Sequence, residues 1–120
     1  MEALRKKIGE AGRSRTFLDN ASNIFEAAEA VARAGGELSE WSILIGDDGG
    51  IHMVAASDWS LDSLQAHHGA RMAYRVRQQD RKVRLEGRAG SRTCLFETAK
   101  PDGAARLLLA QLRPAVRLTA

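Results

Sequence analysis

The sequence predicts one α+β domain in which helices pack on a five-stranded antiparallel sheet. Apolar residues recur at helical spacing in residues 17–34, alternate on both sides of an Asp-Gly turn in residues 41–55, and alternate again in residues 71–98. The chain has 120 residues, of which 44% are hydrophobic and 28% charged. This size and composition are typical of a single globular domain. The expected element order is α-β-β-α-β-β-β-α, with the strands grouped as a two-stranded hairpin and a three-stranded meander.

The chain is expected to divide into a short N-terminal segment and one domain. Residues 1–15 contain Gly9 and Gly12, each of which costs about 1 kcal/mol inside a helix. We therefore predict a flexible basic segment there. Residues 16–120 contain no linker long enough to separate two domains, and they are expected to form the single α+β domain.

Residues 17–34 have the clearest helical pattern in the chain. Their apolar side chains are spaced by three and four residues, which places them on one face of a helix. These side chains belong to Phe17, Ala21, Ile24, Ala28 and Val31. Thr16 and Asp19 resemble a capping box, and Gly35 followed by Gly36 can end the helix in the left-handed conformation.

Residues 41–55 have the pattern of a β-hairpin. Residues 41–45 and 51–55 alternate between two faces, and the Gly- and Asp-rich run between them supplies the positive φ angles that a tight turn needs. Leu44 and Val54 are apolar on the second face. We therefore expect helices on both faces of the sheet.

Two shorter helices are predicted. Ser57 or Ser60 can cap a helix over residues 61–69, which Gly69 would end. A last helix is expected to open at Pro101, and Pro114 ends or kinks it.

Residues 71–98 are expected to form the antiparallel meander, with turns at 78–81 and 87–90. The side chains predicted to face the core are those of Tyr74, Val76, Val83, Leu85, Cys94 and Phe96. The intervening residues include several arginines. These should therefore project from the opposite face of the sheet.

The first hairpin and the helix after it carry a resemblance to a known family. The hairpin reads Ile43-Leu44-Ile45-Gly46-Asp47-Asp48-Gly49-Gly50-Ile51-His52-Met53-Val54, and the covering helix runs from Leu61 to Gly69. In these residues and in its element order the chain resembles the roadblock and longin group of small regulatory domains. The resemblance implies a non-enzymatic domain that dimerises and docks on other proteins, often small GTPases or motor assemblies.

The basic residues are concentrated in one part of the chain. The net charge is +3, but residues 1–70 have a balance of −5, residues 71–92 of +6 and residues 93–120 of +2. Seven of the eight basic residues in the middle stretch are arginine, whose planar fork suits contacts with carboxylate or phosphate. The sequence therefore predicts a basic surface on the meander.

Three interpretations of this basic surface remain open. It can be a solvated face that charge keeps soluble, a docking site for an acidic protein surface, or a contact for nucleic-acid phosphates. An acidic helix surface of a second copy, formed by Glu26, Glu29, Glu37 and Glu40, could fill the second role. The candidate binding residues are Arg75, Arg77, Arg81, Lys82, Arg84 and Arg88. RNA-binding sheets expose aromatic rings for stacking, whereas the rings of this meander are expected to point inward.

The residues that bind metals elsewhere lack the usual spacing here. The candidates are His52, His67, His68 and Cys94, but no HxxxH or CxxC pattern is present. Adjacent residues on a helix point about 100° apart, so His67 and His68 cannot easily share one ion. The acidic turn of residues 47–50 lacks the frame of an EF-hand. We expect no metal ligands.

The sequence also lacks the patterns of catalytic and cofactor sites. Ser57, Asp58 and His52 lie near one another, but no Gly-x-Ser-x-Gly elbow accompanies them. The glycines form neither a GxGxxG nor a Walker loop, and the single cysteine, Cys94, is expected to be a small buried thiol that rules out an intramolecular disulfide. Trp41 and Trp59 are expected to serve in packing. No catalytic residue and no cofactor are predicted.

These patterns favour a small non-catalytic adaptor or regulatory module that acts through protein–protein interaction as a homodimer. Self-association is expected through the first long helix or through an exposed strand edge. The alternative is weak, sequence-nonspecific nucleic-acid binding by the arginine-rich meander. No apolar run approaches the length of a membrane span and the first residues are charged, so we expect a cytoplasmic protein with no membrane partner.

Overall fold

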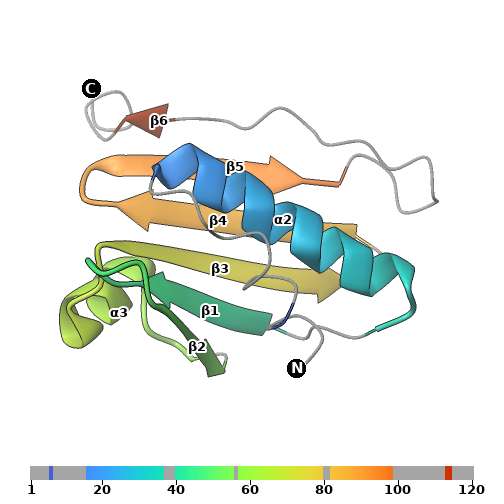
Figure 1. Cartoon of the computed structure of the whole chain (residues 1–120), viewed down its shortest axis with the longest axis horizontal. Coiled ribbons are helices and arrows are strands. Elements are labelled where there is room, and N and C mark those ends of the chain that lie inside the picture. Colours follow the sequence, from blue (N-terminus) through green and yellow to red (C-terminus); the bar gives the residue numbers. More distant parts are fainter. Residues whose placement is uncertain are drawn as a thin grey trace.

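The computed structural model describes Lys6 and residues 16–36, 40–55, 57–79, 82–98 and 113–114. These residues form one antiparallel sheet with a long helix on one face and a short helix on the other (Figure 1). The predicted α+β class is therefore confirmed. The predicted N-terminal segment and last helix fall almost entirely outside the described residues, so both stay predictions.

The sheet contains five main strands and a short sixth. Their bounds are β1 Glu40–Ile45, β2 Ile51–Ala55, β3 Met72–Gln79, β4 Lys82–Ala89, β5 Arg92–Glu97 and β6 Arg113–Pro114. Their order across the sheet is β2-β1-β3-β4-β5-β6, and every neighbouring pair is antiparallel. Because β1 pairs with both β2 and β3, the predicted hairpin and meander join into one sheet. The two-residue β6, paired with β5, was not predicted.

The long helix α2, Phe17–Arg33, matches the predicted helix to within one residue. The Asp19 N–H donates to Thr16 Oγ1 over 3.3 Å, which caps the start of the helix. Gly35 follows the last turn with a φ of 87°, a left-handed conformation that glycine adopts without a steric penalty. The apolar stripe of α2 packs mainly on β4, with contacts to β3 and β5 on either side.

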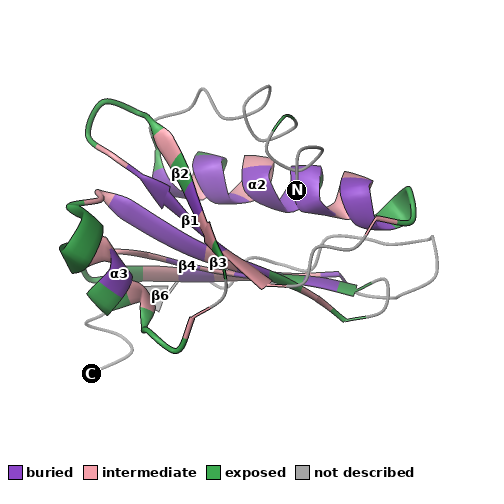
Figure 2. Ribbon diagram, turned by 90° about the horizontal axis from the view of Figure 1, so that it is seen from below, coloured by how far each residue is buried: buried purple, intermediate pink, exposed green. Residues whose placement is uncertain are grey.

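The short helix α3, Leu61–His68, covers the other face at one end of the sheet (Figure 2). Its cap is Ser60, whose Oγ accepts a hydrogen bond from the Ser63 N–H over 3.1 Å. Its Leu64 packs with Leu44 of β1 and Ala73 of β3 in a second, smaller apolar cluster. The predicted cover on both faces of the sheet is thus confirmed.

The first hairpin has the predicted turn. Trp41 lies opposite Ala55 and Ile45 opposite Ile51, so residues 46–50 form the connection. The Gly50 N–H donates to Asp48 Oδ1 over 2.8 Å. This acidic run therefore has the turn geometry that its Asp and Gly residues predict.

The second turn of the meander lies later in the chain than the sequence predicts. It was predicted at residues 87–90, but β4 continues to Ala89 and the chain turns at Gly90, whose φ is 60°. Gly87 instead lies inside β4 against the core. A Cβ at Gly87 would lie 2.7 Å from Tyr74 Cδ1 and 2.9 Å from Cys94 Sγ. This glycine makes room for the tyrosine ring.

The main core lies between α2 and the sheet. Tyr74 is fully buried, stacks on Phe17 with ring centroids 5.5 Å apart, and donates its hydroxyl to the Phe17 carbonyl over 2.7 Å. Phe96 and Cys94 are also buried in this core. The prediction that the meander's aromatic rings point inward is confirmed.

Candidate functional site

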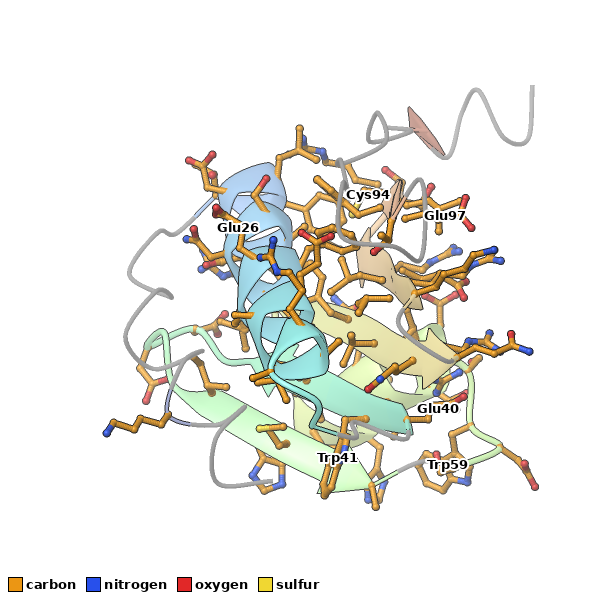
Figure 3. The ribbon with its side chains drawn as sticks, turned by 90° about the vertical axis from the view of Figure 1, so that its right-hand side faces the viewer. Glu26, Glu40, Trp41, Trp59, Cys94 and Glu97 are labelled. Atoms are coloured by element: carbon orange, nitrogen blue, oxygen red, sulfur yellow. The ribbon has the colours of Figure 1, made fainter. Side chains whose placement is uncertain are left out.

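Arg75, Arg77, Arg84 and Arg88 lie on the face of the sheet away from α2, as alternation predicts, whereas Arg92 lies over the Phe17 ring on the α2 side. Arg77 of β3 and Arg84 of β4 are about half exposed, whereas the Arg75 side chain is 17% exposed. Figure 3 shows Glu40 and Glu97 on this same side of the sheet, while Glu26 lies on α2. Of the other candidates, Lys82 is exposed at the start of β4, and Arg81 lies outside the described residues.

Carboxylates separate these guanidinium groups. Arg77 Nη2 lies 3.4 Å from Glu86 Oε1, and Arg77 Nε lies 3.9 Å from Glu40 Oε1. Arg84 Nη1 lies 3.7 Å from Glu97 Oε2, and Arg84 Nε lies 4.0 Å from Glu86 Oε1. The result is an alternating row of charges across four strands. We refer to it as the charge ladder, formed by Glu40, Arg77, Glu86, Arg84 and Glu97.

Strand register explains the ladder. Glu40, Arg77, Arg84 and Glu97 are successive cross-strand neighbours on β1, β3, β4 and β5. Arg77 and Arg84 stand directly opposite one another, an arrangement of like charges that destabilises a sheet. Glu40 and Glu97 flank this pair on either side. Glu86, two residues after Arg84 on β4, lies within 4.0 Å of both arginines. The acidic partners therefore offset the repulsion.

Among the described residues of this face, carboxylates consequently offset most of the positive charge that the basic stretch of sequence brings. The described arginines at 75, 77, 84 and 88 are matched by four carboxylates, at 40, 62, 86 and 97. Each exposed pair contributes only about 0–1 kcal/mol to stability. Their greater effect is on recognition, because a phosphate would have to compete with a carboxylate that is already in place.

Two of the arginines connect the sheet to α3 and to the turn before it. Arg75 donates to the Trp59 carbonyl and, over 3.4 Å, to Ser42 Oγ. Arg88 Nε lies beside Asp62 Oδ1 in the first turn of α3. An open pocket of about 410 Å³ lies between the start of α3 and the sheet, and both arginines line it. These contacts with α3 and the turn before it give Arg75 and Arg88 a structural role.

The predicted acidic helix surface is not one surface. Glu26 is exposed on α2, but Glu29 accepts a hydrogen bond from the Thr98 hydroxyl over 3.2 Å. Glu40 belongs to β1, where it is part of the charge ladder. Glu37 lies outside the described residues. The expected grouping is therefore wrong for Glu40, since the helix ends seven residues before it.

Cys94 and Ser57, which the sequence analysis considered for reactivity, have other roles in the described structure. Burial raises the pKa of the Cys94 thiol to about 12, outweighing the hydrogen bond from the Gly87 backbone that lowers it. Burial also raises the pKa of the Tyr74 hydroxyl well above its usual range. Ser57 Oγ accepts a hydrogen bond from the Trp59 N–H over 3.3 Å, which stabilises the turn before α3. Ser60, rather than Ser57, is the helix cap.

A contact that the sequence analysis missed joins all three histidines. The rings of His52 and His68 have centroids 5.5 Å apart, those of His68 and His67 lie 4.9 Å apart, and Trp59 meets His67 edge-on at 4.8 Å. Alternation along β2 does place His52 on the face that α3 covers. The contact itself depends on how α3 packs, which residue spacing does not reveal. Among the described residues, no group of three or more metal-ligating side chains has the geometry of a metal site.

The outer edge of β2 is open in the part of the chain that the structure describes. The Gly46 N–H donates to the Gly50 carbonyl over 3.0 Å, and the Arg71 N–H donates to the Ile45 carbonyl over 2.8 Å. Hydrogen bonding alternates along an antiparallel pair, so the backbones of His52 and Val54 point toward β1. Those of Ile51, Met53 and Ala55 point outward.

Comparison of the chain with protein-family models, curated proteins and solved structures finds no match. The resemblance to the roadblock and longin group therefore rests on the first hairpin and the element order alone. Neither described helix combines the length and the apolar character needed to cross a bilayer.

Proposed function

We propose that this chain is a small non-catalytic adaptor or regulatory module that acts through protein–protein contacts as a homodimer joined at β2. One observation carries the proposal: β2 forms an edge of the sheet with three outward-pointing backbone positions and no charged residue. An unpaired strand edge is a template for another strand, and proteins that must stay monomeric usually protect it with lysine, proline or a bulge. The residues Ile51–Ala55 include neither of those residue types.

A second copy of β2 fits this edge. In an antiparallel pair centred on Met53, Ile51 of one copy lies opposite Ala55 of the other, and the outward positions form about six hydrogen bonds. Neither copy brings a charge to the pair. The apolar face that carries Ile51 and Met53 would continue from one sheet into the next.

The first long helix supports self-association less well. Nine of its 17 residues are buried in the folded chain, including the whole predicted apolar stripe.

The charge ladder favours protein contacts over nucleic acid, because its guanidinium groups are interleaved with carboxylates. Weak nucleic-acid binding, the alternative from the sequence, has no exposed ring among the described residues of the meander to support it.

Sedimentation equilibrium with matched variants tests the dimer. Ala55 and Ala66 are both exposed, but Ala55 lies on the β2 edge and Ala66 on α3. Ala55→Lys places a charge in the proposed interface and should raise the dimer dissociation constant at least about tenfold, or 1.4 kcal/mol. Ala66→Lys adds the same charge elsewhere and should leave the constant unchanged. Ala55→Pro, which removes one outward N–H, should act like Ala55→Lys.

The outcome can go against the proposal in two ways. A wild-type chain that is monomeric at tens of micromolar would remove the homodimer. A dimer that all three variants leave intact would place the interface elsewhere. For the adaptor role, capture of protein from native lysate should survive nuclease treatment; capture that nuclease abolishes would support the nucleic-acid alternative instead.

A further inference from the structure

The chain has three histidines, and all three meet on one side of the molecule. His52 comes from β2, while His67 and His68 end α3. The contact between His52 and His68 therefore joins residues of two different elements, 16 positions apart in sequence. Such convergence from a strand and a helix brings together two side chains of the type that most often binds metals.

His52 and His68 also share a pocket. A cavity of about 290 Å³ lies between the first hairpin and the end of α3, with the two imidazoles on its wall. Leu44 and Ala70 supply apolar lining, and Gly46 and Gly50 of the hairpin turn complete it. The pocket is partly open to solvent, so a small ligand could enter it.

The spacing of the two rings suits a shared metal ion. An imidazole nitrogen binds Zn²⁺ at about 2.0–2.1 Å, so two imidazoles on one tetrahedral ion have ring centroids about 5 Å apart. The observed separation of 5.5 Å is close to this value. Imidazole is a good ligand for zinc, copper and nickel, whereas magnesium and calcium prefer oxygen.

The surroundings of the pair favour a cation. The C-terminal end of a helix carries a partial negative charge, and His68 is the last residue of α3. The hairpin turn that borders the pocket contains Asp47 and Asp48, both exposed. No lysine or arginine lines the pocket among the described residues.

From these observations we infer that His52 and His68 form a two-histidine site for a zinc-class transition-metal ion, with water in the remaining positions. His67 is not a ligand. It neighbours His68 on the helix, where consecutive side chains point about 100° apart, and its ring packs edge-on against Trp59. The site adjoins the proposed dimer but does not require it, because the backbone contacts of the dimer come from Ile51, Met53 and Ala55.

Calorimetric titration of the full chain with Zn²⁺ in a non-chelating buffer tests this site. The wild type should bind one ion per chain. His52→Gln and His68→Gln should each weaken binding at least about tenfold, because loss of even an outer-sphere partner typically costs that much. The double variant keeps neither imidazole and should show no saturable binding in the same range.

The matched control is His67→Gln, which removes the third histidine and should leave Zn²⁺ affinity unchanged. All three side chains are exposed, so these variants should fold, and circular dichroism checks this. Binding that His67→Gln weakens as much as His52→Gln does would contradict the assignment of ligands. A wild type with no saturable binding up to about 1 mM Zn²⁺ would overturn the site altogether.

Discussion

Gly87→Ala should destabilise the chain even though it adds only one methyl group to a strand. Without close neighbours, alanine in a strand would be more stable than glycine by about 0.5–1 kcal/mol. At position 87 the new Cβ would lie 2.7 Å from Tyr74 Cδ1, 2.8 Å from Tyr74 Cε1 and 2.9 Å from Cys94 Sγ. These neighbours are buried, and overpacking of this kind costs typically about 1–3 kcal/mol. We expect a net loss of about 1–2 kcal/mol.

Urea unfolding followed by tryptophan fluorescence measures this loss, with the m-value expected to stay constant. Gly46→Ala is the matched control, because its Cβ would meet only the movable Asp48 Oδ1, at 3.2 Å. The control should change stability by less than about 0.5 kcal/mol. If Gly87→Ala were as stable as Gly46→Ala, the argument that Gly87 makes room for the tyrosine ring would be refuted.

Three further predictions concern the core and the charge ladder. Tyr74→Phe should cost about 1–3 kcal/mol in the same unfolding assay, because the buried Phe17 carbonyl loses its donor; no loss would contradict that bond. Stability should fall as pH rises from about 9 to about 12, since unfolded Cys94 loses its proton there while the buried thiol keeps it; Cys94→Ala should reduce this slope, and the part that stays comes from buried Tyr74. Unrelated oligonucleotides should show no binding by fluorescence anisotropy at low salt, whereas phosphate contacts by Arg75, Arg77 and Arg84 would give a log–log salt slope of about −2 to −3.

The elements of the fold could be predicted because their determinants are local. Residues 17–34 carry both their apolar spacing and their caps, and the Asp- and Gly-rich run at 46–50 is typical of a turn. The same local pattern predicts a turn at Gly87, whereas Gly87 lies inside β4. Glycine is typical of turns, and only the tertiary contact with Tyr74 explains why one is needed inside a strand.

The surface could be predicted less well because it depends on register and packing. The alternation of Arg75, Arg77 and Arg84 correctly gave their face of the sheet. It did not reveal that Glu40 arrives from β1 and Glu97 from β5 to pair with them. A charge count along the chain shows the excess of arginine. It does not show the glutamates that pair with these arginines, because folding brings them together from other strands.

The most direct test of a dimer joined at β2 is amide hydrogen exchange of this strand at increasing protein concentration. His52 and Val54 point toward β1, so their amides should be protected at every concentration. The amides of Ile51, Met53 and Ala55 point outward and should become protected only as concentration rises from about 1 µM to about 1 mM. Exchange at these three positions that does not depend on concentration would contradict the proposed interface.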